Sequence, residues 1–182
     1  MDDKPGPLYL PGDPEPAIDA MIRVDHAGEY GAVRIYEGQL SVLPHSLARD
    51  AIEDMAAQEK RHLETFDRLI VERRVRPTLL SPVWRVAGFA LGAVTARMGP
   101  RAAMACTVAV EEVIDEHYRQ QSEWLGAEDT DLKLVIDEFR ADELAHRDTA
   151  LNHEAERAAG YPVLSAFVKF GSRAAIWLST RF

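Results

Sequence analysis

The apolar side chains of this sequence recur every three or four residues over most of its length. That spacing places them along one face of an α-helix and predicts amphipathic helices that pack against one another. Six stretches show the pattern, at about residues 17–43, 47–74, 82–98, 101–124, 130–160 and 162–179. Sustained apolar–polar alternation is missing, as are Asn-Gly and Asp-Gly hairpin turns. We therefore predict an all-α protein.

The ends of the predicted helices carry recognisable signals. Ser46 is placed to cap the second helix, and Ser81, which a proline follows, is placed to cap the third. Five prolines precede the first helix and predict an irregular N-terminal arm over residues 1–16. Residues 17–182 are then expected to form a single domain, which suits a chain of this length.

Two short motifs of the form Glu-x-x-His lie within the helical stretches. One consists of Glu59 and His62, and the other of Glu143 and His146. Residues i and i+3 share a face of a helix, so the carboxylate and the imidazole can bind one metal ion together. One such motif is weak support for a metal site, but a repeated motif is stronger.

The chain around the motifs also repeats. A glutamate precedes each motif by a similar interval, Glu29 in the first half and Glu111 in the second. A tyrosine follows each of these glutamates by almost two helical turns and so lies on the same face, Tyr36 in the first half and Tyr118 in the second. The repeat unit is a helical hairpin, and two hairpins predict a four-helix bundle.

Four carboxylates and two imidazoles would converge inside such a bundle. This donor set suits two iron or manganese ions, and it is the set found in ferritin-like di-iron carboxylate proteins. Buried charged groups destabilise a fold unless they are paired or metal-bound. The alternative is that these are surface charges, or a polar stripe that only fixes helix register. The candidate ligands are Glu29, Glu59, His62, Glu111, Glu143 and His146.

Helical periodicity also indicates which of two adjacent glutamates points into the bundle. Glu111 lies on an apolar stripe, whereas Glu112 shares its stripe with charged residues, so Glu111 is expected to point inward. A histidine ligand usually donates its second N–H to a carboxylate or a carbonyl. Asp25, Asp115 and Asp142 are candidates for that role, and each is equally well read as a surface charge.

Other polar and small residues near the predicted ligands have more than one reading. Gly28 and Gly31 flank Glu29 in a helix, where each glycine costs about 1 kcal/mol relative to alanine. Either a packed helix or a substrate is expected to approach that backbone, and helix packing is the simpler account. Tyr118, its counterpart Tyr36 in the first half and the adjacent His117 are candidates for contact with a ligand or substrate, and structural packing is the alternative.

Composition narrows the classes of function. The net charge of −9 over 182 residues argues against nucleic acid as the main partner. Cys106 is the single cysteine, so an intramolecular disulfide is impossible, which fits a reducing compartment. The N-terminal residues lack a signal-peptide pattern, and apolar runs fall short of the roughly 18–20 residues of a spanning helix. We expect a cytosolic protein that contacts at most a membrane surface.

Two stretches combine apolar, aromatic and basic residues and contain no acidic residue, residues 75–110 and residues 161–182. This combination without spanning length is typical of helices that lie on a membrane surface. We therefore expect the third and the last helices to face a membrane and the substrate to be lipid-soluble. A buried core helix or a dimer interface is the alternative.

Four segments resemble the demethoxyubiquinone hydroxylase family of ubiquinone biosynthesis. They are residues 23–32 (RVDHAGEYGA), 59–62 (EKRH), 105–112 (ACTVAVEE) and 142–146 (DELAH). The likeness covers nearly the whole chain after the proline arm, and the family's iron ligands fall on the six candidate ligands named above. The resemblance implies a ferritin-like di-iron monooxygenase that uses O₂ to hydroxylate a polyprenylated methoxy-methyl-benzoquinol, with NADH or another reductant as the electron source.

The resemblance also carries expectations about location and partners. It implies a peripheral protein on the cytoplasmic side of a bacterial inner membrane, with a lipid-binding accessory protein of ubiquinone biosynthesis as a possible partner and a homo-oligomer as a possible assembly. The competing enzymatic reading is a ferritin-like protein that scavenges peroxide or stores iron. The basic, aromatic-rich helices argue against that reading, since a soluble scavenger does not need them.

Overall fold

The computed structural model describes residues 17–182, and the predicted arm over residues 1–16 lies outside this part. The described chain is all-α and contains no strand. Its helices are α1 (Ala17–Val42), α2 (Leu47–Glu72), α3 (Ser81–Arg97), α4 (Pro100–Leu125), α5 (Thr130–Asn152), a 3₁₀ turn η1 (Ala155–Arg157) and α6 (Tyr161–Ser179). The predicted fold class, all-α, is confirmed for residues 17–182.

The predicted helix ends hold at some positions and fail at others. The Ser46 side chain accepts a hydrogen bond from the backbone N–H of Arg49 and caps α2 as expected. Ser81 does not cap α3, because the helix begins at Ser81 itself and Leu80 is the N-cap residue. The Ser81 hydroxyl instead donates to the Thr78 carbonyl at 3.0 Å.

The fifth helix is shorter than the predicted stretch to residue 160. It ends at Asn152, and Glu154 adopts a left-handed backbone with φ of 61°. The 3₁₀ turn that follows buries Ala155 completely against the core. Within the turn only Ala155 is buried, whereas Glu156 and Arg157 are exposed, so the early stop of α5 coincides with the packing of this one side chain on the core.

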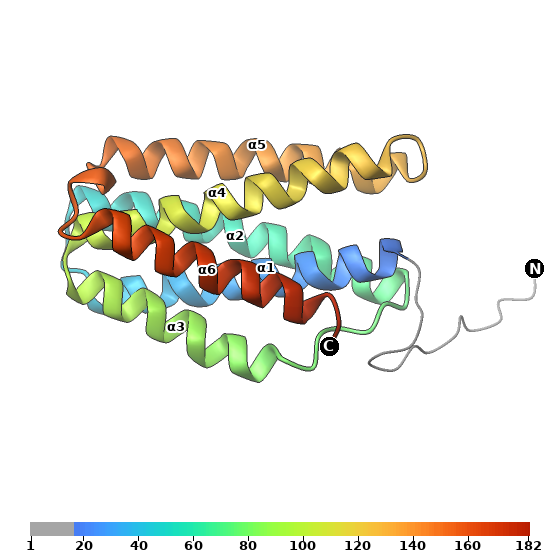
Figure 1. Ribbon diagram of the computed structural model, residues 1–182, viewed down its shortest axis with the longest axis horizontal. Helices are drawn as coiled ribbons and strands as arrows, with labels where there is room; N and C mark the ends of the chain where they lie inside the picture. The colour runs from blue at the N-terminus through green and yellow to red at the C-terminus, as the bar shows by residue number, and fades with distance from the viewer. Residues whose placement is uncertain (1–16) are drawn as a thin grey trace, which may run out of the picture.

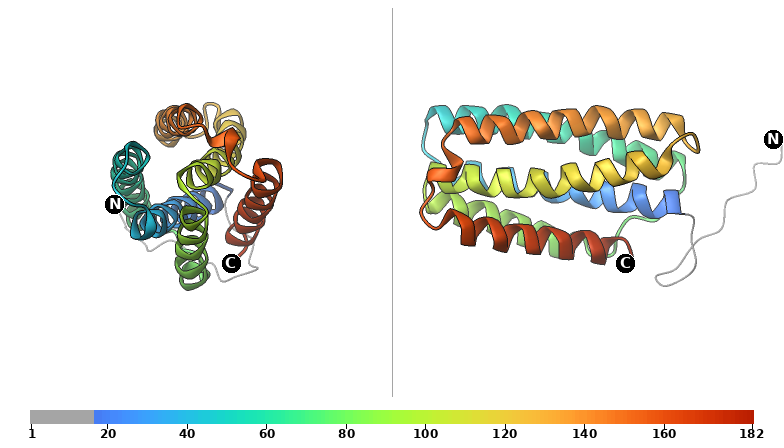
Figure 2. Two further views of the ribbon diagram at one scale, coloured as in Figure 1. Left: turned by 90° about the vertical axis from the view of Figure 1, so that its left-hand side faces the viewer. Right: turned by 45° about the horizontal axis from the view of Figure 1, so that its top comes forward.

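The four long helices, α1, α2, α4 and α5, run side by side along the longest axis of the molecule (Figure 1). Two further helices lie outside this group: α3 packs on α1, and α6 packs mainly on α4. Figure 2 shows α3 and α6 next to each other on one side of the molecule, away from α2 and α5.

Close contact between α1 and α3 depends on glycines. A Cβ atom at Gly92 would overlap the carbonyl oxygen of Ile35, and one at Gly38 would overlap the carbonyl oxygen of Phe89. The absence of side chains at these positions lets the two backbones approach each other. The glycines thus permit close packing of α3 on the outer side of α1.

The exposed faces of α3 and α6 are apolar. Four large apolar residues of α3 and four of α6 are exposed, namely Val83, Val86, Phe89, Val94, Val163, Phe167, Phe170 and Trp177. This exposure argues against the alternative that the two helices are buried core. Among the described residues, no helix is both long enough and apolar enough to cross a membrane.

Candidate metal centre

The six candidate ligands meet between the four long helices. Two overlapping groups form, and within each group one donor atom from every residue lies within 4.8 Å of the others. Glu59 and Glu143 belong to both groups; Glu29 and His62 complete the first, and Glu111 and His146 complete the second. All six side chains are buried. The arrangement thus has two adjacent donor sets that share two carboxylates.

Each imidazole directs its Nδ1 atom at carboxylates from both halves of the chain. His62 Nδ1 lies 3.2 Å from Glu143 Oε1 and 3.6 Å from Glu29 Oε2. His146 Nδ1 lies 3.0 Å from Glu59 Oε1 and 3.3 Å from Glu143 Oε2. The sequence repeat is therefore a structural one, because each hairpin supplies donors to both groups.

Two apolar clusters close off this polar layer. Along α2, Met55 belongs to one cluster and Phe66 to the other, and the Glu-x-x-His motif lies between them. The ring of Phe139 from α5 stacks on the His62 imidazole with centroids 3.9 Å apart. Bulk water is thereby kept away from the carboxylates.

Burial without metal perturbs the acid groups strongly. Burial and the neighbouring carboxylates raise the pKa of Glu59 well above its usual range. Burial and the nearby Glu143 do the same to the pKa of Glu111. Burial lowers the pKa of His62, but its contacts with Glu143 and Glu29 outweigh this and raise the pKa to about 10. The raised pKa values of Glu59, Glu111 and Glu143 thus favour protonation of these carboxyl groups unless another positive charge is present.

The Nε2 atom of each histidine contacts the residue that directly precedes the other Glu-x-x-His motif. His62 Nε2 lies 3.0 Å from Asp142 Oδ2, and His146 Nε2 lies 2.9 Å from Gln58 Oε1. Asp142 directly precedes Glu143, and Gln58 directly precedes Glu59 in the same way. Both contacts fix the ring so that Nδ1 faces the carboxylates.

Only one of the three aspartates predicted for that role contacts these imidazoles. Asp142 does so, whereas Asp115 accepts a hydrogen bond from Arg140 at 2.6 Å. Asp25 is buried and accepts from the Gln121 side chain at 2.8 Å, with His117 Nε2 at 3.3 Å. Gln58 carries no charge that would mark it as a candidate in the sequence, but it corresponds to Asp142 when the two halves of the repeat are aligned.

The two tyrosines cross-link the halves of the repeat. The Tyr36 hydroxyl donates to Glu111 Oε1 at 2.8 Å, and the Tyr118 hydroxyl donates to Glu29 Oε1. Each tyrosine therefore contacts the carboxylate of the other hairpin, although each follows its own glutamate on the same helix face. Both hydroxyls are directed at oxygens of the candidate centre, which supports the prediction that they contact a ligand residue.

Glu111 is the inward residue, as its periodicity predicts. It is buried, whereas the neighbouring Glu112 is partly exposed and forms an ion pair with Lys169 of α6. The two adjacent glutamates thus serve different purposes, one inside the helix group and one between α4 and α6.

The donor atoms that face the centre fit a metal cluster. Eight such atoms are buried without a hydrogen-bond partner: both oxygens of Glu59 and of Glu143, one oxygen each of Glu29 and Glu111, and the Nδ1 atoms of His62 and His146. Buried polar groups are normally satisfied, and unsatisfied ones call for an explanation such as an ion. Carboxylate oxygens with two imidazole nitrogens are donors that iron and manganese accept.

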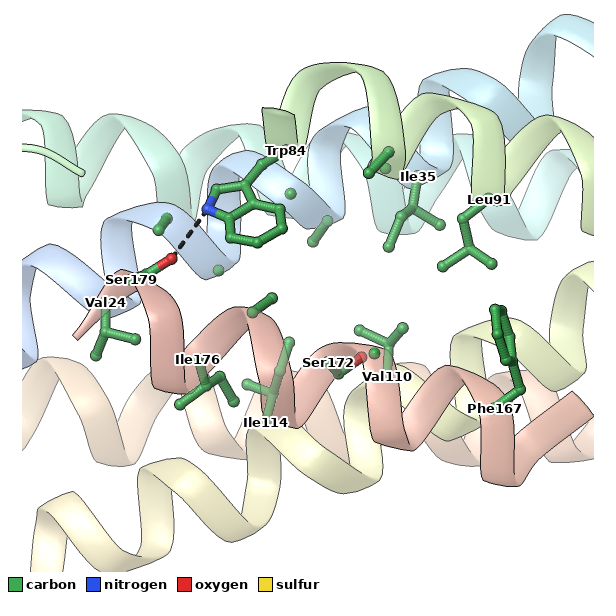
Figure 3. A pocket seen from close by; sticks show the side chains of 18 residues that line it. Val24, Ile35, Trp84, Leu91, Val110, Ile114, Phe167, Ser172, Ile176 and Ser179 are labelled. Atoms are coloured by element: carbon green, nitrogen blue, oxygen red, sulfur yellow. Dashed lines mark hydrogen bonds between the residues drawn. The ribbon is translucent and has the colours of Figure 1, made fainter. Parts of the chain in front are cut away.

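An apolar cavity of about 340 Å³ lies beside the centre, between α1, α3, α4 and α6. Val24 and Ile35 line it from α1, Val110 and Ile114 from α4, and Ile176 from α6 (Figure 3). At one end the Trp84 indole N–H donates to the Ser179 hydroxyl at 2.9 Å. Because Val110 immediately precedes Glu111, the cavity and the carboxylates lie on adjacent faces of α4.

Comparison with known proteins places this architecture in a family. The family described as "Ubiquinone biosynthesis protein COQ7" matches residues 16–179. This chain belongs to that family. A Rhodospirillum rubrum member, named 3-demethoxyubiquinol 3-hydroxylase, is 55% identical over 175 residues, which cover 94% of this chain and 82% of the relative.

Eukaryotic members of the COQ7 family are similar over a comparable share of this chain. The human protein named NADPH-dependent 3-demethoxyubiquinone 3-hydroxylase, mitochondrial, is 52% identical over 169 residues, covering 91% of this chain and 78% of the relative. The Saccharomyces cerevisiae protein named 5-demethoxyubiquinone hydroxylase, mitochondrial, is 42% identical over 181 residues, covering 90% and 78%. The resemblance stated from the sequence motifs is thus confirmed at the level of the family.

Proposed function

We propose that this protein is a 3-demethoxyubiquinol 3-hydroxylase of ubiquinone biosynthesis. Family membership and the names of relatives that are 52–55% identical support the reaction. The observation that carries the chemistry is the convergence of buried, unpartnered carboxylate and imidazole atoms into two groups that share Glu59 and Glu143. A hydroxylase that uses O₂ needs a redox-active site of this kind, whereas a protein that merely binds quinones does not.

The reaction replaces a ring hydrogen by a hydroxyl group. One atom of O₂ forms the new C–O bond at the unsubstituted ring carbon, and the other atom leaves as water. Two electrons from a reductant and two protons complete the balance. Two iron ions bound by Glu29, Glu59, His62, Glu111, Glu143 and His146 would supply oxygen activation.

The residues around the centre prepare it for this chemistry. Asp142 and Gln58 orient the two imidazoles, and Tyr36 and Tyr118 hold one oxygen each of Glu111 and Glu29. The hydrogen bonds leave the second oxygen of each of these two glutamates unpartnered and available to a metal ion. The apolar clusters at both ends exclude water, which would otherwise compete for the oxidising species.

The architecture fits a ferritin-like four-helix bundle with two added helices. α1, α2, α4 and α5 each contribute ligand residues, in the pattern of one Glu from each of two helices and Glu-x-x-His from each of the others. The added helices, α3 and α6, expose apolar and aromatic side chains and carry arginines, which supports attachment to a membrane surface.

The cavity beside the centre is suited to a lipid-soluble quinol. Its lining is almost entirely apolar, and α3 and α6, with their exposed apolar faces, form two of its walls. A polyprenyl tail can therefore extend from the cavity toward the bilayer while the ring reaches the carboxylates of α1 and α4. His117 is a less direct candidate, since it contacts Asp25 and Gln121 rather than the cavity.

Location and partners follow the same reasoning. We place the protein on the cytoplasmic face of a bacterial inner membrane, because the Rhodospirillum rubrum relative is bacterial and the exposed apolar faces of α3 and α6 suit attachment to a membrane surface. The names of several eukaryotic relatives specify NADPH, so NADH or NADPH is the proposed source of electrons. A lipid-binding accessory protein and self-association are compatible with the apolar faces.

Quinone profiling of a deletion strain tests the function. Deletion of the gene should cause a demethoxy-quinone to accumulate, and the intact gene should restore the normal quinone. A His146→Ala variant should fail to restore it although the protein is present at normal abundance. A normal quinone pool in the deletion strain, or full rescue by the His146→Ala variant, contradicts the proposal.

A further inference from the structure

Three glycines of the apolar cavity have open space where a side chain would lie. Gly28 and Gly31 of α1 and Gly171 of α6 line the cavity, and a Cβ atom placed on any of them would meet no atom within 4 Å. Gly92 is different, since its Cβ would overlap the backbone of α1. A Cβ atom at Gly88 of α3 would lie 2.9 Å from the Gly31 carbonyl oxygen, so α3 does approach the Gly31 backbone as the helix-packing account expects, but the space that a side chain at Gly31 or Gly28 would occupy stays open.

An unpacked glycine inside a helix is costly. It lowers helix stability relative to alanine, and alanine would fit at all three positions without touching the protein. The sequence nevertheless keeps glycine on two facing walls of one cavity, since α1 and α6 lie on opposite sides of it. The space that the three methyl groups would occupy is thus left open toward the cavity.

The lining of the cavity indicates which part of a quinol uses that space. The side chains are apolar except at Trp84, Ser172 and Ser179, and the Trp84 indole and the Ser179 hydroxyl are already bonded to each other. The Ser172 hydroxyl alone would leave most oxygens of a methoxy-quinol ring without partners against such walls, which is unfavourable. An isoprenoid chain has no such requirement.

We propose that Gly28, Gly31 and Gly171 are specificity-determining residues that set the width of the cavity for the isoprenoid tail of the quinol. This inference rests on the proposed function. Gly28 and Gly31 flank Glu29 in the chain, so the widened section begins next to a carboxylate of the candidate centre. A tail bound in this section would place the quinol ring where α1 and α4 contact each other.

The test is to compare stability with ligand binding in Gly28→Ala, Gly31→Ala and Gly171→Ala. The probes are a demethoxy-benzoquinone with two isoprene units and the same ring without a tail, and the readout is quenching of tryptophan fluorescence, since Trp84 lines the cavity. We expect Tm to rise by about 2–4 °C in each variant. We expect the Kd of the tailed quinone to rise about tenfold and that of the tailless ring to stay unchanged.

The control is Gly92→Ala, which should lower Tm because its methyl group overlaps the backbone of α1. A more stable Gly31→Ala variant with an unchanged Kd for the tailed quinone overturns the inference, as does a fall in Tm at the cavity glycines. Wild-type protein that binds the tailed quinone but forms no hydroxylated product contradicts the proposed function and leaves the glycine inference standing. Wild-type protein that does not bind the tailed quinone contradicts the glycine inference.

Discussion

Glu59→Gln should stabilise the metal-free protein while it abolishes the binding of metal. Glu59 is fully buried, neither of its oxygens has a hydrogen-bond partner, and it belongs to both donor groups. Because burial and the neighbouring carboxylates raise its pKa in the folded protein, folding without metal requires either a proton or a buried charge at neutral pH. An amide of the same shape removes that requirement.

The size and the pH dependence of the effect follow from the buried carboxyl. An amide carries no charge, and its N–H groups can donate to the neighbouring carboxylates, so the gain is about 1–3 kcal/mol, which for a chain of this length raises Tm by roughly 3–9 °C. The folded-state pKa lies above the unfolded value, so the penalty is absent below the ordinary glutamate pKa of about 4.3 and grows as pH rises through the folded-state pKa. The gain from Glu59→Gln should therefore appear at pH 7 and vanish near pH 4.

The assay is thermal unfolding of metal-free protein at both pH values, followed by measurement of bound iron after reconstitution. Glu64→Gln on the exposed face of the same helix is the matched control and should change neither Tm nor iron content. A Glu59→Gln variant that is less stable without metal, or that still binds two iron ions per chain, would refute the reasoning.

Three further outcomes are expected. Asp142→Ala should weaken metal binding about 10–100-fold in a metal titration, because its imidazole partner loses orientation, whereas Asp115→Ala should leave the affinity unchanged. Gly38→Ala should lower Tm in thermal unfolding, since its Cβ would overlap the Phe89 carbonyl, and an unchanged Tm would show that α3 can move away. Phe170→Glu on the exposed face of α6 should reduce co-sedimentation with anionic lipid vesicles at unchanged Tm, and equal sedimentation would argue against that face as the membrane contact.

The sequence predicts most of the fold because its helices are strongly periodic and end at prolines or capped residues. Ser46 caps α2 through a local contact that the sequence alone reveals. The end of α5 is different. Glu154 adopts a left-handed backbone there, and the next residue, Ala155, is buried in the core. Such a stop depends on contacts with other helices and has no glycine or proline signal at the break.

The candidate centre is predictable to the extent that the chain repeats. The inward orientation of Glu111 follows from its own helix, because its neighbours on the stripe are apolar. The partner of His146 does not, because Gln58 lies on another helix and a glutamine carries no charge to mark it. The same holds for Gly28 and Gly31, whose open surroundings depend on where α3 and α6 come to lie.

The most direct test of the central claim is an iron titration of hydroxylation. Metal-free protein receives increasing Fe(II) without oxygen, and product is then measured by mass spectrometry after demethoxyubiquinol, reductant and O₂ are added. The account predicts no product without iron and a linear rise that breaks at two iron ions per chain, because two donor groups share Glu59 and Glu143. Product that forms without iron, or a break at one ion per chain, would contradict it.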